Sequence, residues 1–201
     1  MRDVALRAKK DELLMPLAVR WPDAVHPNAI SAAAMWVGLA AAGAVMAEQT
    51  WLGLALWLVN RLLDGLDGLV ARLQAKQSDL GGYLDLMMDF VVYLAIPPAF
   101  VYAAPTTFNL WAGLILVGSF VLNTVSWTVP AAILEKVRYR STGRVTSIEM
   151  PSGLIEGAET ILFYSLFFLL PGLVGWLFLV MAALVLFTVG QRVVWAARRL
   201  R

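Results

Sequence analysis

The sequence contains no cysteine and a single histidine, and charged residues make up only 15% of the chain. Without cysteine there is no disulfide framework, no zinc–thiolate site and no thiol nucleophile. We interpret the one histidine, His26, as a residue at a membrane boundary rather than a catalytic base. In contrast, 60% of the 201 residues are hydrophobic and the mean hydropathy is +0.73. This balance excludes an ordinary soluble domain and is typical of an integral membrane protein.

Long apolar segments recur along the chain, and each can cross the hydrocarbon core of a bilayer, which is about 30 Å thick. Turn signals separate them, including Pro105, Pro151 and the Pro171-Gly172 pair. The sequence therefore predicts an all-α, polytopic membrane protein with six transmembrane helices. The expected spans are 28–47, 51–73, 82–104, 108–134, 153–170 and 174–195.

The stretch before the first span mixes leucines with charged residues over positions 4–20. This pattern predicts an N-terminal amphipathic interfacial helix that ends at Trp21-Pro22, with a partly ordered basic tail as the alternative. No small-residue cleavage pattern follows the first apolar run, so no cleaved signal peptide is expected. We expect a surface segment over 1–27 and one six-helix domain over 28–201.

Positive charge is distributed unevenly among the loops. Lysine and arginine cluster before the first span, in the second and fourth loops and at the tail, whereas the first, third and fifth loops have none. The positive-inside rule therefore predicts that both termini and the even loops are cytoplasmic. We expect a protein of a bacterial inner (plasma) membrane.

Four aspartates lie inside the second and third apolar segments, where an ionised side chain is costly. Asp64 and Asp67 are three residues apart and share one helix face, as do Asp85 and Asp89, which are four apart. The short polar linker 74–79 suits a tight connection between antiparallel helices, which brings both pairs to the cytoplasmic side. A divalent metal is the obvious partner for so much negative charge. Singly, these acids have alternatives: an ion pair of Asp64 with Arg61, or a proton or sodium site in a transporter.

The ordered string resembles a known signature. It reads Asp64-x2-Asp67-Gly68-x2-Ala71-Arg72-x8-Gly81-x3-Asp85-x3-Asp89 and fills every fixed position of the CDP-alcohol phosphatidyltransferase (class I) pattern. The resemblance implies metal-dependent transfer of a phosphatidyl group from CDP-diacylglycerol to the hydroxyl of a small alcohol, with release of CMP, in phospholipid biosynthesis. It also implies two Mg²⁺ or Mn²⁺ ions held by the four aspartates, with Asp89 as the candidate general base.

The same resemblance implies a nucleotide site. Gly68 and Gly81 have no Cβ and would let a nucleotide lie against the backbone, beside the small Ala71. Arg72 can form a forked contact with phosphate. The expected nucleotide-binding residues are Asn28, Asp67, Gly68, Ala71, Arg72 and Gly81. The alternatives are that the glycines serve helix packing and that Asn28 and Ser31 cap the first span.

The acceptor alcohol is left open. Arg138, Arg140 and Arg144 could hold a phosphorylated acceptor, or could serve only topology and attraction to anionic lipid. Glu156 and Glu159 lie at the start of the fifth span, in a run that resembles an element of the aminoalcohol phosphotransferase branch, and their carboxylates could suit a cationic acceptor. That branch implies a CDP-aminoalcohol donor and a lipid acceptor. The alternative role of the two glutamates is to stabilise a helix N-terminus.

The expected partners are the lipid bilayer, the two substrates and a second copy of the chain, because the resemblance implies a homodimer. No nucleic acid is expected. A cation- or proton-coupled transporter is the alternative of another class, since transporters also use intramembrane acids.

Overall fold

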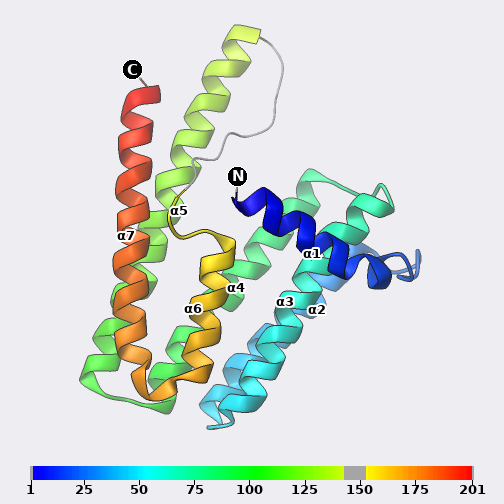
Figure 1. The fold of residues 1–201 in the computed structure, drawn as a ribbon. Helices are drawn as coiled ribbons and strands as arrows, with labels where there is room; N and C mark the ends of the chain where they lie inside the picture. Colours follow the sequence, from blue (N-terminus) through cyan, green and yellow to red (C-terminus); the bar gives the residue numbers. More distant parts are fainter. Residues whose placement is uncertain (1, 143–152, 201) are drawn as a thin grey trace. The chain divides into compact units, whose positions relative to one another are not determined.

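The computed structural model describes residues 2–142 and 153–200, and every regular element in these two ranges is helical. The helices divide between two compact units, which we describe separately: unit 1 comprises Met1–Pro105 and Ser165–Gly172, and unit 2 comprises Thr106–Tyr164 and Leu173–Arg201. Figure 1 gives the element order. The elements are α1 (Arg2–Ala18), α2 (Pro27–Met46), α3 (Thr50–Leu73), α4 (Asp79–Ala103), α5 (Thr107–Thr142), α6 (Gly157–Leu169), the 3-10 turn η1 (Pro171–Leu173) and α7 (Val174–Arg199).

The all-α membrane fold is confirmed. Four stretches are long and apolar enough to cross a bilayer, namely α2, α4, residues Thr107–Lys136 of α5, and Pro171–Arg199, which contains α7. Helix α6 is apolar but has only 13 residues. Helix α3 has 24 residues, but Arg61, Asp64 and Asp67 interrupt its apolar sequence. Each expected segment overlaps one of the helices, whereas the count of six spans stays a prediction.

Close packing of α2 against its neighbours organises unit 1. A Cβ added at Gly38 would lie 2.6 Å from the Val92 side chain and 3.0 Å from the Asn60 amide nitrogen. A Cβ at Gly53 would lie 3.1 Å from the Ala41 carbonyl oxygen of α2. Small residues thus let α2 approach both α3 and α4.

Helix α1 lies across α3, as Figure 1 shows for unit 1. Its Leu14 and Ala18 are buried in a cluster with residues of α2 and α3, including Leu66 and Val70. Leu17 stays exposed. The predicted N-terminal helix therefore exists, and it rests on the helix that carries the first two signature aspartates.

A short turn joins α3 to α4 and brings their acidic residues together. Ala75 adopts a left-handed backbone with φ of 52°. Ser78 then caps α4, because its Oγ accepts a hydrogen bond from the Gly81 amide at 3.0 Å. The tight connection predicted for the 74–79 linker is confirmed.

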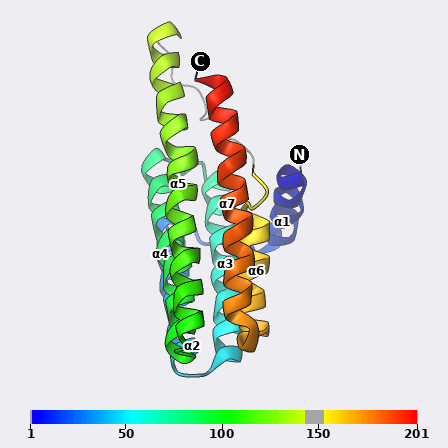
Figure 2. The ribbon, with the colours of Figure 1, turned by 90° about the vertical axis from the view of Figure 1, so that its left-hand side faces the viewer.

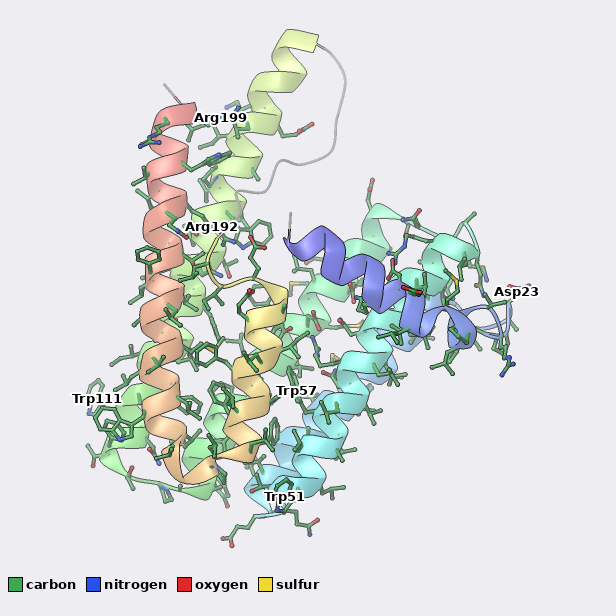
Figure 3. The ribbon with its side chains drawn as sticks, viewed as in Figure 1. Asp23, Trp51, Trp57, Trp111, Arg192 and Arg199 are labelled. Carbon is green, nitrogen blue, oxygen red and sulfur yellow. The ribbon has the colours of Figure 1, made fainter. Side chains whose placement is uncertain are left out.

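Unit 2 is built on α5 and α7, which lie side by side and run in the same direction (Figure 2). Inside this pair Arg192 Nη1 donates to Asn123 Oδ1 at 2.8 Å. Figure 3 places Arg192 and Arg199 towards one end of unit 2 and Trp111 towards the other. In unit 1 it places Asp23 and Trp51 at opposite ends.

Candidate active site

The four signature aspartates lie on α3 and α4 of unit 1. Asp67 is buried, with 4% of its surface exposed, and both of its oxygens accept hydrogen bonds. Ser31 Oγ on α2 donates to Asp67 Oδ2 at 2.5 Å, and the Gly68 amide donates to Oδ1. Neutral donors on two helices therefore fix the orientation of this carboxylate.

A pocket of about 170 Å³ opens beside Asp67. It contains all six residues that the sequence assigned to the nucleotide, together with Asp85. The remaining residues of its lining come from the start of α2, from the turn between α3 and α4 and from the first turn of α4. The lining is Pro27, Asn28, Ser31, Asp67, Gly68, Ala71, Arg72, Lys76, Gln77, Ser78, Gly81, Gly82 and Asp85. The structure therefore brings the expected nucleotide residues together on three helices.

The two signature glycines meet different surroundings. A Cβ at Gly81 would lie 3.0 Å from Ser78 Oγ and 3.2 Å from Asn28 Oδ1, so any side chain there would press on the pocket lining. A Cβ at Gly68 would meet only Arg72 Nη1, at 3.5 Å. Gly81 is needed for the approach of α4 to α2, whereas Gly68 leaves open space beside Arg72.

Asp64 and Asp89 border a second cavity, which is narrow and has essentially no free volume. Asp85 lines both this cavity and the larger pocket. Ser31 and Asn60 complete the polar part of the narrow cavity. Asp85 thus connects the larger pocket with the cavity that Asp64 and Asp89 border.

Arg61 on α3 is the strongest positive partner of these acids. Its Nη2 donates to Asp89 Oδ1 at 2.7 Å, while Nη1 lies 3.7 Å from Asp64 Oδ2. The pairing with Asp64 considered from the sequence therefore exists, but the closer contact is with Asp89 on the neighbouring helix. A buried guanidinium also accounts for the tolerance of several carboxylates within the spans.

The four aspartates supply carboxylate oxygens, which are suitable ligands for hard divalent cations, and they border two adjoining cavities. Their positions are not those of an assembled centre: over residues 2–142 and 153–200, no three acidic or histidine side chains converge on a common point suitable for a metal. Asp67 and Asp89 instead accept hydrogen bonds from Ser31 and Arg61. The ligand set is present, and ion binding would require the carboxylates to move closer together.

Arg72 borders the pocket and reaches the N-terminal helix. Its Nη2 donates to Asp11 Oδ2 at 2.8 Å, and 46% of the arginine side chain is exposed. Lys76 Nζ donates to the Asp23 carbonyl oxygen at 2.6 Å. Both cations beside the pocket are therefore tied to the segment that precedes α2.

The helix cap at the start of α2 differs from the alternative considered for Asn28 and Ser31. His26 caps this helix, since its Nδ1 accepts from the Asn28 amide at 3.2 Å. Ser31 contacts Asp67 and, at 3.4 Å, the Pro27 carbonyl oxygen. Asn28 and Ser31 both line the pocket.

The expected acceptor residues belong to unit 2 or to its undescribed part. Arg138 and Arg140 fall in the last turns of α5, where only the backbone is described, and Arg144 lies outside the described residues. Glu156 Oε1 accepts from the Gly153 amide at 2.8 Å, and Glu159 Oε2 accepts from the Glu156 amide at 3.2 Å. These contacts stabilise the start of α6, as in the alternative considered for these two acids.

Sequence reasoning assigned no role at the site to Lys76, Gln77 and Ser78 of the pocket, and it considered Arg61 only as a partner of Asp64. The polar residues at 74–79 predicted a tight connection between two helices. They did not predict which side chains of this connection face the pocket. The signal for Arg61 is its place one helical turn before Asp64, and its link to Asp89 depends on how α3 and α4 face each other.

The chain is similar over most of its length to a known protein family and to a described protein. A family model described as CDP-alcohol phosphatidyltransferase matches residues 24–190. The protein described as inner membrane protein YnjF of Escherichia coli (strain K12) is 34% identical over 148 residues, which cover 73% of this chain and 71% of that protein. Both alignments are long enough to include the signature and its surroundings.

Proposed function

Because the chain belongs to the CDP-alcohol phosphatidyltransferase family, whose members transfer a phosphatidyl or similar group from a CDP-alcohol, we propose that its donor is CDP-diacylglycerol and its acceptor a small alcohol. The product would be a phospholipid and the leaving group CMP. The protein is an integral membrane enzyme, so a lipid-linked donor can reach it from the bilayer. Family membership argues against the transporter alternative.

One observation carries this proposal: the six expected nucleotide residues and Asp85 line a single pocket, and Asp85 also borders the cavity of Asp64 and Asp89. A nucleotide held in the pocket would bring its pyrophosphate towards the acids. Arg72 on the pocket wall can form a forked contact with a phosphate oxygen, in exchange for its exposed pair with Asp11.

The proposed reaction is a single displacement at phosphorus. The acceptor hydroxyl oxygen attacks the phosphorus that carries diacylglycerol, and the bond from that phosphorus to the bridging oxygen breaks. CMP leaves with the bridging oxygen and its electron pair. Asp89 accepts the hydroxyl proton on its carboxylate. Gly68 and Gly81 keep the backbone accessible to the cytidine diphosphate.

Two divalent cations, Mg²⁺ or Mn²⁺, would be held by Asp64, Asp67, Asp85 and Asp89, and would neutralise the pyrophosphate charge. The support is the donor chemistry, because carboxylate oxygens are suitable ligands for these ions. Ser31 and Arg61 would keep Asp67 and Asp89 oriented within that set.

The acceptor stays the open part of the proposal. The capping contacts of Glu156 and Glu159 give no support to the CDP-aminoalcohol alternative, in which acids would bind a cationic group. Arg138, Arg140 and Arg144 remain candidates for a phosphorylated acceptor. We also propose a homodimer, because the family implies one, and cytoplasmic termini, because the loop charges favour them. A surface segment over 1–27 would precede a domain over 28–201.

An assay of CMP release tests the function. Purified protein in lipid nanodiscs would receive CDP-diacylglycerol, Mg²⁺ or Mn²⁺, and in turn glycerol 3-phosphate, serine, inositol phosphate, ethanolamine and choline. We expect CMP with one acceptor and none after chelation of the metal. A parallel reaction with CDP-choline or CDP-ethanolamine and diacylglycerol tests the other donor class. CMP only in that parallel reaction would overturn the proposed donor, and CMP in neither would overturn the proposed transfer.

A further inference from the structure

Arg61 is buried, and its guanidinium contacts polar and aromatic side chains. Only 7% of its side chain is exposed, and each guanidinium nitrogen has a polar neighbour. Nε donates to Asn60 Oδ1 at 2.7 Å, Nη1 donates to the Tyr93 hydroxyl at 2.8 Å, and Nη2 donates to Asp89 Oδ1 at 2.7 Å. The Cζ atom lies 4.7 Å from the Trp57 ring centroid and 5.0 Å from that of Tyr93. Hydrogen bonds and two aromatic rings together fix the guanidinium plane.

The residues that hold Arg61 are held in turn by other helices. Asn60 Nδ2 donates to the Ala34 carbonyl oxygen of α2 at 2.7 Å. Trp57 Nε1 donates to Ser165 Oγ at 3.2 Å, and its ring stacks with Phe168 at a centroid distance of 6.3 Å. The position of Arg61 therefore depends on α2, α4 and the end of α6, and not on α3 alone.

This fixed guanidinium engages one oxygen of Asp89. Asp89 Oδ1 accepts the charge-assisted bond, which holds one of the two oxygens of this carboxylate in place. A general base must present one particular oxygen to the attacking hydroxyl, and small misplacements reduce the rate strongly. A fixed Oδ1 determines where Oδ2 lies.

We propose that Arg61 is a positioning residue of the transfer reaction, which orients the Asp89 carboxylate through the pair between Nη2 and Oδ1. This inference rests on the proposed function. Arg61 also neutralises part of the charge of Asp64 and Asp89, so it opposes the binding of a cation beside them. Arg61 therefore lowers the affinity of the site for a metal ion while it orients the base.

Two substitutions separate charge from geometry. Arg61→Met removes both, whereas Arg61→Lys keeps a positive charge but loses the planar fork. With Arg61→Met we expect kcat for CMP release to fall about a hundredfold with KM for CDP-diacylglycerol within about threefold. Calorimetric titration of Mn²⁺ without substrate should give about tenfold tighter binding. Arg61→Lys should keep the Mn²⁺ affinity near that of the unmodified protein and lose part of kcat.

A merely structural role gives a different result, since a loosened fold lowers kcat and Mn²⁺ affinity together. Arg198→Met, on the exposed last turn of α7, is the matched control and should leave both unchanged. The proposal is overturned if Arg61→Met keeps kcat within about threefold of the unmodified protein, or if its Mn²⁺ affinity falls. If Arg61→Met does not fold, Arg61→Lys decides: an unchanged kcat, or a second failure to fold, overturns the positioning role. Absence of CMP release and Mn²⁺ binding in the unmodified protein would instead reject the proposed function.

Discussion

Asp67 and Asp89 belong to the same signature but occupy contrasting surroundings. Asp67 lines the wider pocket and accepts hydrogen bonds from neutral groups, the Ser31 hydroxyl and the Gly68 amide. Asp89 borders the narrow cavity and pairs with the charged Arg61. Asp67 is therefore oriented by neutral hydrogen-bond donors, whereas Asp89 is oriented by an ion pair with a buried guanidinium.

Asp85 lines both the wider pocket and the narrow cavity, so its substitution should reduce activity the most. Asp85→Asn removes a carboxylate that borders both cavities, and we expect CMP release to fall by about a thousandfold or more. Steady-state assays in Mn²⁺ measure this. The control is Asp79→Asn on the exposed first turn of the same helix, which should keep its activity. More than a tenth of the original rate in Asp85→Asn would contradict the account.

Substitutions of Asp89 and Asp67 should separate turnover from binding. Asp89→Asn should lower turnover by about 10²- to 10⁴-fold, because the amide cannot accept the hydroxyl proton, with little change in affinity for the CDP donor. Asp67→Asn should weaken that affinity directly. Equilibrium binding of CDP-diacylglycerol beside the CMP assay checks both. Near-normal turnover in Asp89→Asn would mean that the base lies elsewhere.

A pair of adjacent glycines provides a steric test of the pocket end. Gly81→Ala places a Cβ within 3.0 Å of Ser78 Oγ and 3.2 Å of Asn28 Oδ1, so we expect about tenfold weaker binding of CDP, measured by calorimetry. Gly82→Ala is the comparison variant, because Gly82 also lines the pocket but nothing lies within 4 Å of its Cβ position. Equal loss in both variants would show that the contacts with Ser78 and Asn28 are not the cause, and no loss in Gly81→Ala would show that the nucleotide does not bind in this pocket.

The smallest effect is expected for the exposed ion pair of Arg72 and Asp11. Its side chains are 46% and 30% exposed, so the pair contributes at most about 1 kcal/mol to the free energy of unfolding. Asp11→Asn should lower the thermal midpoint only slightly and change CDP affinity by less than about threefold. Glu12→Gln, at the next exposed position, is the control. A tenfold loss of affinity in Asp11→Asn would make α1 part of the nucleotide site.

The helical layout could be predicted from the sequence because apolar runs and turn residues specify it locally. The fifth segment shows the limit of that information. It was expected from residue 153, but α6 begins at Gly157. The Gly153 amide instead donates a hydrogen bond to the Glu156 carboxylate, and the Glu156 amide donates one to the Glu159 carboxylate. Capping contacts of this kind depend on side-chain directions that a hydropathy pattern does not contain.

The lining of the candidate site was predictable where residues belong to the ordered string, as Gly68, Ala71 and Arg72 do. It was not predictable where contacts join distant helices. Ser31 and Asp67 are 36 positions apart, and Arg61 and Asp89 are 28 apart, so each contact depends on how two helices are rotated against each other. Spacing along one helix favoured Asp64 as the partner of Arg61, whereas helix packing brings Asp89 closer.

The most direct measurement is the affinity of the protein for CDP with and without Mn²⁺, by calorimetric titration of protein in nanodiscs. The account predicts that CDP binds tightly only when Mn²⁺ is present, and that Asp67→Asn and Asp85→Asn each abolish this dependence. The same CDP affinity in Mn²⁺ and in chelator would contradict it.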